Sequence, residues 1–189
     1  MRQFKQNFRS FAQLIATVAF AIGFLYAGQV QAATSHTWSD SLTVEKCVTI
    51  DIKVKKFKKC AKITFKVYFK LHNVTYTTIN GQRVPTQATI KMGISSPVSQ
   101  SHSFPIRPAD AGKYIYKNFG FSYNGISANA KLGFKFSNNK SGYFGTITAY
   151  GYTQGSISAK LCAKAFGKKK CTSVSKTSSK TTRLGSLTL

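Results

Sequence analysis

Lysine is the side chain whose number and spacing in this 189-residue sequence point most clearly to a chemistry. Lys62, Lys66 and Lys70 are separated by even intervals, which would place them on one face of a β-strand. Lysine acts as a mobile point charge, so such a face suits loose, salt-dependent contact with phosphate, sulfate or carboxylate groups. The candidate polyanion-binding residues are Lys53, Lys55, Lys62, Lys66, Lys70, Lys91, Lys168, Lys169 and Lys170.

The charge balance also favours an anionic partner. The chain has 28 Lys and Arg against 4 Asp and Glu, a formal net charge of +24, whereas soluble surfaces usually intersperse both signs. After residue 32 it contains 22 Lys and 3 Arg, a ratio that disfavours sequence-specific nucleic-acid recognition. The expected partner is an anionic polymer or an anionic membrane surface, such as lipopolysaccharide, an acidic glycan or extracellular nucleic acid. The alternative is that the charge only keeps the protein soluble or retains it at a cell surface.

Residues suited to catalysis or metal binding are scarce. Four carboxylates nearly exclude carboxylate-dyad hydrolases, calcium cages and two-metal sites. His36, His72 and His102 show no metal-ligand spacing, and the one catalytic arrangement to weigh is a ribonuclease-like pair of histidines with Lys70. Polar loop and surface histidines are the simpler interpretation, so we expect no enzyme, no cofactor and no metal site.

Residues 1–32 have the order of a secretory signal peptide. Arg2, Lys5 and Arg9 precede an apolar run over residues 11–28, and small residues follow at 30 and 32. An uncleaved membrane anchor is the alternative, because the run is about long enough to span a thin bilayer. We expect export to the periplasm, the cell surface or the extracellular space.

Four cysteines in an exported chain predict two disulfides. Cys47, Cys60, Cys162 and Cys171 have separations of 13 and 9 residues within their pairs, which suit a zinc site poorly. Four cysteines allow three pairings, and spacing alone does not choose among them.

Two Asn-Gly dipeptides lie between alternating apolar runs and predict β-hairpins, because this dipeptide favours tight hairpin turns. Turns at residues 80–81 and 124–125 would place apolar side chains opposite each other on one face. The pairs are Leu71 and Ile90, Phe69 and Met92, and Val67 and Ile94 for the first turn, and Phe121 and Ala128, Phe119 and Ala130, and Ile115 and Phe134 for the second.

Three more turns are predicted downstream. A loop at residues 138–141 would place Phe136 opposite Tyr143, and a three-residue turn would follow at Thr153-Gln154-Gly155. A turn at Phe166-Gly167 would leave Cys162 opposite Cys171.

The first cysteine pair is harder to place. Pairing Cys47 with Cys60 needs a chain reversal near Lys53, because thirteen extended residues would hold the two about 43 Å apart. The alternation changes within residues 55–60, however, which indicates a turn or bulge there instead. The pairing therefore stays open at the level of the sequence.

These patterns predict an all-β fold, an antiparallel sandwich or barrel of eight or nine strands, mostly joined to their sequence neighbours. Residues 33–189 would form a single β domain, with a long loop at 95–112 between its two halves. Alternation places Lys70 opposite Lys91 on the face away from the core, and Lys53 and Lys55 on the outward face of the first strand. The same alternation brings five aromatic residues outward, where they could stack on sugars or bases or pack on another element: Tyr114, Tyr116, Phe144, Tyr150 and Tyr152.

Three functions are compatible with this sequence. The first is a secreted, strongly basic β domain that binds anionic polymers or surfaces through a lysine-rich sheet face. The second is a structural or adhesive cell-surface subunit that assembles through its strand edges. The third is a small outer-membrane β-barrel, although four acids would not neutralise a lysine-lined lumen.

Overall fold

A computed structural model describes residues 35–189, so the predicted signal peptide over residues 1–32 lies outside the described part. Eight strands account for most of that part. They are β1 (His36–Ile52), β2 (Lys55–Ile79), β3 (Gln82–Ser96), β4 (Gln100–Ile106), β5 (Ile115–Tyr123), β6 (Ile126–Asn138), β7 (Thr146–Ala165) and β8 (Lys168–Thr188), with one short 3₁₀ turn, η1 (Pro108–Asp110).

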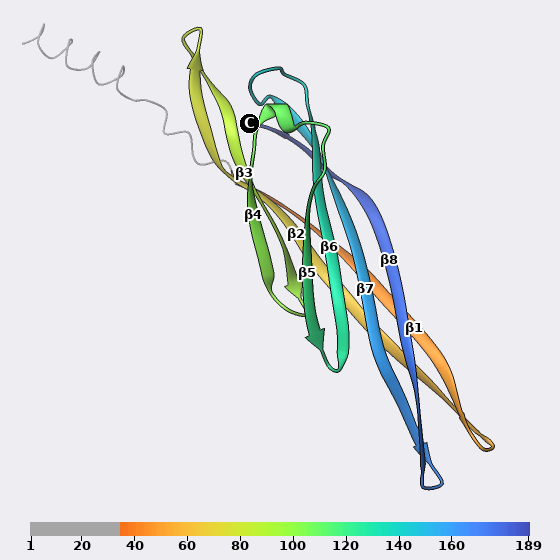
Figure 1. The fold of residues 1–189 in the computed structure, drawn as a ribbon. Helices are drawn as coiled ribbons and strands as arrows, with labels where there is room; N and C mark the ends of the chain where they lie inside the picture. The colour runs from red at the N-terminus through yellow and green to blue at the C-terminus, as the bar shows by residue number, and fades with distance from the viewer. Residues whose placement is uncertain (1–34) are drawn as a thin grey trace, which may run out of the picture. The chain divides into compact units, whose positions relative to one another are not determined.

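The strands form two four-stranded antiparallel sheets in simple sequence order. Sheet A has the order β1-β2-β3-β4, and sheet B has the order β5-β6-β7-β8 (Figure 1). This confirms the predicted all-β fold, and of the two architectures considered it is the sandwich. The long loop predicted at residues 95–112 is a correction, because it contains strand β4, and the crossing between sheets is confined to the segment that carries η1.

Both Asn-Gly hairpins have the predicted registers. Phe69 lies opposite Met92, and Phe119 lies opposite Ala130. The turn residues Asn80, Gly81, Asn124 and Gly125 all have positive φ, as the tight hairpin turn requires. In the first hairpin the register shifts by one residue at Thr75 and is restored at His72, so the two irregularities compensate and the apolar pairs beyond them are those predicted.

The predicted register between β6 and β7 was wrong. Phe136 lies opposite Ala149 and not Tyr143, because the connecting loop runs over residues 139–145. Side chains close this longer loop: the Asn138 amide donates to the carbonyls of Lys140 and Tyr143, and the backbone N–H of Thr146 donates to Asn139 Oδ1. The shift is an even number of residues, so the predicted core face was still correct.

The predicted turn at Thr153-Gln154-Gly155 was also wrong, because β7 continues unbroken through it. Gly155 serves close packing between the sheets instead of a turn. A Cβ atom on it would lie 2.5 Å from the Phe65 ring and 2.9 Å from Val44 Cγ2. Four residues earlier on the same face of β7, a Cβ atom on Gly151 would lie 2.9 Å from the Phe69 ring. Phenylalanines of β2 therefore fill the space left by glycines of β7.

Aromatic and branched side chains fill the interior between the sheets. Phe65, Phe69, Phe134 and Phe136 are all fully buried. Phe144, which alternation placed outward, is only 1% exposed and packs against Phe136 with ring centroids 5.7 Å apart. The loop register moved Phe144 out of the strand pattern, which explains the wrong prediction.

We expect Gly155→Ala to destabilise the sandwich by about 1–3 kcal/mol, because the added methyl group overlaps two buried side chains. Chemical denaturation would measure the loss. Ser158→Thr is the control, because it adds a methyl group at an exposed position of the same strand. Equal stability of Gly155→Ala and the parent would contradict the close packing.

A partly buried ion pair between Asp40 of β1 and Lys180 of β8 joins the two sheets. The Asp40 carboxylate accepts hydrogen bonds from Lys180 Nζ, from the Thr182 hydroxyl and from the backbone N–H of Ser41. Burial alone raises the pKa of Asp40, but the hydrogen bonds and the charge of Lys180 outweigh it and leave the pKa below its ordinary value. The ionised form of Asp40 therefore stabilises the contact between the sheets.

Asp40→Asn should lower the free energy of unfolding at neutral pH by about 1–2 kcal/mol. Because the folded-state pKa of Asp40 is depressed, its stabilising contribution is present above the ordinary value of 3.8 and is lost as the pH falls through the folded-state value. Denaturation curves of parent and variant should therefore converge in acid. Asp51→Asn, at an exposed position, is the control, and a pH-independent gap would contradict this role of Asp40.

Candidate functional site

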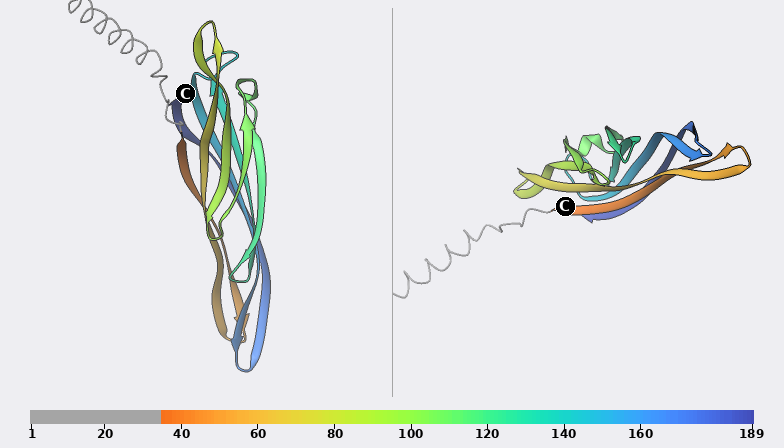
Figure 2. Two further views of the ribbon diagram at one scale, coloured as in Figure 1. Left: turned by 90° about the vertical axis from the view of Figure 1, so that its left-hand side faces the viewer. Right: turned by 90° about the horizontal axis from the view of Figure 1, so that it is seen from below.

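Two hairpins run on past the ends of the other strands. The β1–β2 and β7–β8 hairpins, orange and blue in Figure 1, extend beyond strands β3 to β6, and both views of Figure 2 place their turns at the same end of the molecule. Lys53 and Val54 form the first turn, and Phe166 and Gly167 form the second. Segments more than a hundred residues apart in the sequence thus end side by side.

Each hairpin is closed by a disulfide between directly paired residues. Cys47 bonds Cys60, and Cys162 bonds Cys171. Of the three possible pairings the structure has the sequential one, and the chain reverses at Lys53 and Val54, not within residues 55–60. Disulfides of this kind are typical of an oxidising compartment.

A small apolar cluster holds the two hairpins together beyond the disulfides. Ile50 and Ile52 of β1 are buried with Ala163 of β7. On the turn side, Lys170 Nζ donates to the carbonyl oxygen of Asp51 at 3.3 Å. The ammonium groups of Lys53 and Lys55 make cation–π contacts with the Phe166 ring, 5.4 and 5.3 Å from its centroid. The ends of the β1–β2 and β7–β8 hairpins are thus held together by direct contacts between them.

This junction gathers exposed lysines from both hairpins. Nine lie on the turn side of the two disulfides, and we call them the basic tip: Lys53, Lys55, Lys56, Lys58, Lys59, Lys164, Lys168, Lys169 and Lys170. Asp51 is the one carboxylate within residues 48–59 and 163–170. Five of the predicted polyanion-binding residues belong to the basic tip, and the structure brings them together from both ends of the chain.

The position of Lys55 differs from the prediction. Because the chain turns at Lys53 and Val54, Lys55 pairs with Ile52 and does not extend the outward face of β1. Its ammonium group lies instead over Phe166, between the hairpins. Lys53 also differs from the prediction, because it lies in the turn and not on the outward face of β1. Lys62, Lys66, Lys70 and Lys91 lie on the outward face that alternation predicted.

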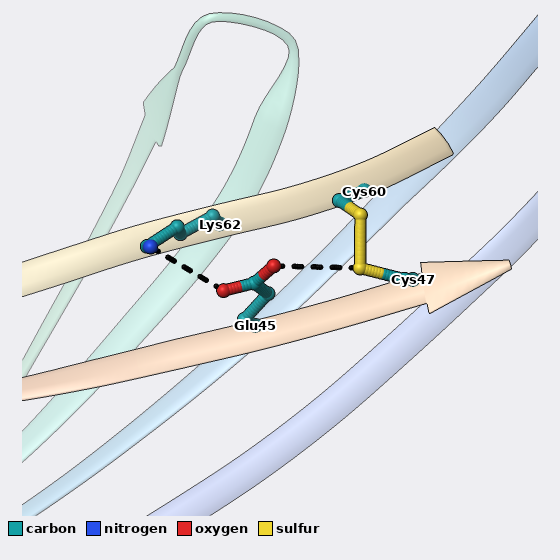
Figure 3. The surroundings of a disulfide bond; sticks show 4 residues. All are labelled: Glu45, Cys47, Cys60 and Lys62. Carbon is teal, nitrogen blue, oxygen red and sulfur yellow. Dashed lines mark hydrogen bonds and ion pairs between the residues drawn. A yellow bond between two sulfur atoms is a disulfide. The ribbon is translucent and has the colours of Figure 1, made fainter. Parts of the chain in front are cut away.

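These remaining lysines form a row on the outer face of sheet A. Lys62, Lys66 and Lys70 follow one another along β2, and Lys91 of β3 is paired with Lys70. Lys62 Nζ lies 3.4 Å from Glu45 Oε2, so the charge nearest the disulfide is partly neutralised (Figure 3). The row is sparser and less uniformly positive than the basic tip.

The group of Glu45, Cys47 and Cys60 has ligand atoms close enough for a metal ion. Both sulfurs belong to a disulfide, however, and offer no thiolate to a metal. Glu45 Oε1 lies 3.4 Å from Cys47 Sγ, and because a disulfide sulfur carries no proton this is a contact without hydrogen-bond donation (Figure 3). This group is therefore a disulfide that crosslinks β1 and β2, with a carboxylate beside it.

The histidines considered for catalysis lie on three different strands. His36 of β1 packs edge-on against Trp38, and His102 of β4 packs edge-on against Phe104, each with centroids 4.6 Å apart. His72 of β2 is paired with Thr89. These two ring contacts give His36 and His102 packing roles.

Comparison of the chain with protein-family models, with curated proteins and with solved structures finds no match. Within residues 35–189, no helix has the length and apolar character needed to cross a membrane. The function is therefore inferred from the side chains that the fold brings together.

Sequence reasoning identified lysines at both turns but not their convergence. Lys56, Lys58, Lys59 and Lys164 belong to the same cluster and were not among the predicted binding residues. The sequence does contain a feature that the two turns share: a cysteine pair encloses each lysine-rich turn, at separations of 13 and 9 residues.

Replacing the second disulfide by Cys162→Ser with Cys171→Ser should open the end of the β7–β8 hairpin locally. The hairpin end buries few side chains, and the loss of the crosslink costs about 2–3 kcal/mol in the chain-entropy account. We expect trypsin to cut within residues 168–170 about tenfold faster or more, as measured by peptide mapping of limited digests. Cys47→Ser with Cys60→Ser is the matched control, which should expose residues 53–59 instead. Unchanged cleavage in both variants would show that the hairpin ends do not depend on the disulfides.

Proposed function

We propose that this protein is an exported, non-catalytic binding protein that attaches to anionic polymers or surfaces through its basic tip. The observation that carries the proposal is the convergence of nine exposed lysines, from two hairpins, around a single aspartate. Lipopolysaccharide, acidic glycans and extracellular nucleic acid all offer the repeated phosphate, sulfate or carboxylate groups that such a surface attracts.

The arrangement costs free energy, and this supports a binding role. Like charges gathered on neighbouring strands repel each other. Two disulfides, a small apolar cluster and the Phe166 contacts offset the repulsion at the hairpin ends. An anionic partner would relieve the repulsion directly, and the release of its counterions would drive binding.

The row on the outer face of sheet A extends the same surface. Lys66, Lys70 and Lys91 continue along the sheet from the hairpin that carries Lys53 and Lys55. A polymer bound at the basic tip could follow the row, whereas a compact anion would occupy the tip alone. We therefore assign the tip the leading part and the row a supporting one.

Heparin, a sulfated polymer, is a suitable probe of the basic tip. A site with four to six simultaneous contacts should lose about a hundredfold or more in affinity between 50 and 200 mM salt. Lys168→Gln, Lys169→Gln and Lys170→Gln together should lower both the affinity and the salt slope, because three of the contacts are removed while the strands remain. Titration calorimetry at several salt concentrations would measure both quantities.

The matched control removes three exposed lysines outside the tip, by Lys113→Gln, Lys140→Gln and Lys176→Gln. The control should keep most of the affinity and the original salt slope. Equal weakening in the two triple variants would mean that attraction follows net charge alone, and the basic tip would then not be a site. Replacing Lys62, Lys66, Lys70 and Lys91 by Gln should have an effect between these two.

A further inference from the structure

A second cluster of aromatic and basic side chains covers the outer face of sheet B, on strands β5 to β7 and the segment before β5. Tyr114 and Tyr116 stack with ring centroids 5.3 Å apart and an interplanar angle of 17°. Lys131 Nζ lies 4.4 Å from the Tyr116 centroid, and Lys135 Nζ lies 5.0 Å from that of Tyr114. We call this group, together with Tyr150 and Tyr152, the tyrosine–lysine ladder.

The ladder continues across β7. Lys135 Nζ also lies 5.3 Å from the Tyr150 centroid, and the Tyr152 ring meets Tyr116 edge-on at 5.8 Å. Lysine and tyrosine side chains are thus interleaved over three neighbouring strands. The contacts hold the two ammonium groups in place, because each lies over at least one ring face.

A glycine makes room for the ladder. Gly133 of β6 is paired with Tyr116 on one side and Tyr152 on the other. A Cβ atom on Gly133 would lie 2.6 Å from Tyr116 Cε1 and 3.1 Å from Tyr152 Cβ. The Tyr116 ring therefore lies across the backbone of β6, and the sequence leaves the space open for it.

A shallow hollow of about 260 Å³ adjoins the ladder. Its polar lining consists of Asn118, Asn129, Lys131, Gln154 and Ser156. Lys131 belongs to both the hollow and the ladder, so one ammonium group serves both. The hollow is smaller than the roughly 300–1,000 Å³ of pockets for drug-sized ligands, and it suits a single sugar ring.

The chemistry of the lining favours a sugar that carries an acidic group. Three side-chain amides can each donate and accept hydrogen bonds, which matches the hydroxyl groups of a sugar. Lys131, Lys135 and Arg183, which is paired with Tyr150, offer positive charge on the same face. Residues 111–189, which include all of sheet B, contain no Asp or Glu that could neutralise it.

The same geometry disfavours stacking of a nucleic-acid base. Along the strands, Lys131 contacts Tyr116 from one side and Tyr114 stacks on it from the other, so a base would have to displace one of them to stack on this ring. Base stacking needs an open ring face. Sugar hydroxyl and carboxylate groups can be bound instead by hydrogen bonds from amides and ammonium groups, which remain available.

We propose that the outer face of sheet B carries a binding site for an acidic glycan. One sugar ring occupies the hollow, its hydroxyl groups meet Asn118, Asn129 and Gln154, and its carboxylate or sulfate group meets Lys131. The chain of the glycan continues over the ladder toward Lys135 and Arg183. This site lies on a different face from the row and involves none of the lysines of the basic tip, so it stands or falls independently of the proposed function.

The test uses three probes of matched length: a tetramer of galacturonic acid, its methyl-esterified neutral form, and a dT oligonucleotide. Titration calorimetry should show binding of the acidic tetramer, with Lys131→Gln weakening it about tenfold. Gln154→Ala should weaken both sugar tetramers, because it removes hydrogen bonds to hydroxyl groups. Lys140→Gln removes one exposed lysine outside both the ladder and the basic tip, and it should leave binding of the acidic tetramer within about twofold.

Two outcomes would overturn the proposal. Equal effects of Lys131→Gln and Lys140→Gln would show attraction by net charge without a site. Tighter binding of the oligonucleotide than of the acidic tetramer, lost in Tyr116→Ala, would assign the ladder to nucleic acid. The triple Gln variant of residues 168–170 distinguishes this site from the basic tip, because it should lose heparin affinity and keep the affinity for the tetramer.

Discussion

The close approach of β7 to sheet A is the constraint on which the rest of this structure depends. Gly151 and Gly155 leave space that the rings of Phe69 and Phe65 fill, so that β7 packs tightly against β2 of sheet A. Because interiors are close-packed, a strand that carries a glycine at these points cannot turn there without opening a cavity. β7 therefore runs straight through, and its length carries the β7–β8 hairpin out to the basic tip.

Beyond the sandwich, the two hairpins have little apolar surface to bury against each other. Ile50, Ile52 and Ala163 form only a small cluster. A two-stranded ribbon is marginally stable in water, and gathered positive charge weakens it further. At this end the disulfides provide the stability that the small apolar cluster does not, which explains why both lie between the sandwich and the turns. The same stapling allows lysines to be concentrated where an ordinary surface would disperse them.

The four carboxylates are confined to β1 and η1, and two of them already have lysine partners. Asp40 binds Lys180 at the junction of the sheets, and Glu45 lies beside Lys62 on the outer face of sheet A. Sheet B has no Asp or Glu of its own, and Lys131 and Lys135 on its outer face pack on tyrosine rings instead. Positive charge is therefore presented in two ways: as a dense cluster of exposed lysines at the basic tip and as ammonium groups that lie over tyrosine rings on the ladder.

The sequence by itself determined what depends on alternation and on two-residue turns. The Asn-Gly hairpins, the Phe166-Gly167 turn and the pairing of Cys162 with Cys171 follow from local chemistry, since a tight turn sets the register of the pairs that follow it up to the first uncompensated bulge. The tertiary structure decided what depends on a partner distant in the sequence. Gly155 resembles a turn residue until Phe65 is seen to occupy its space, and the two lysine-rich turns become one surface only because packing between the sheets brings their hairpins together. Local patterns contain no information on such contacts, because side chains on opposite sheets meet only after the chain has folded.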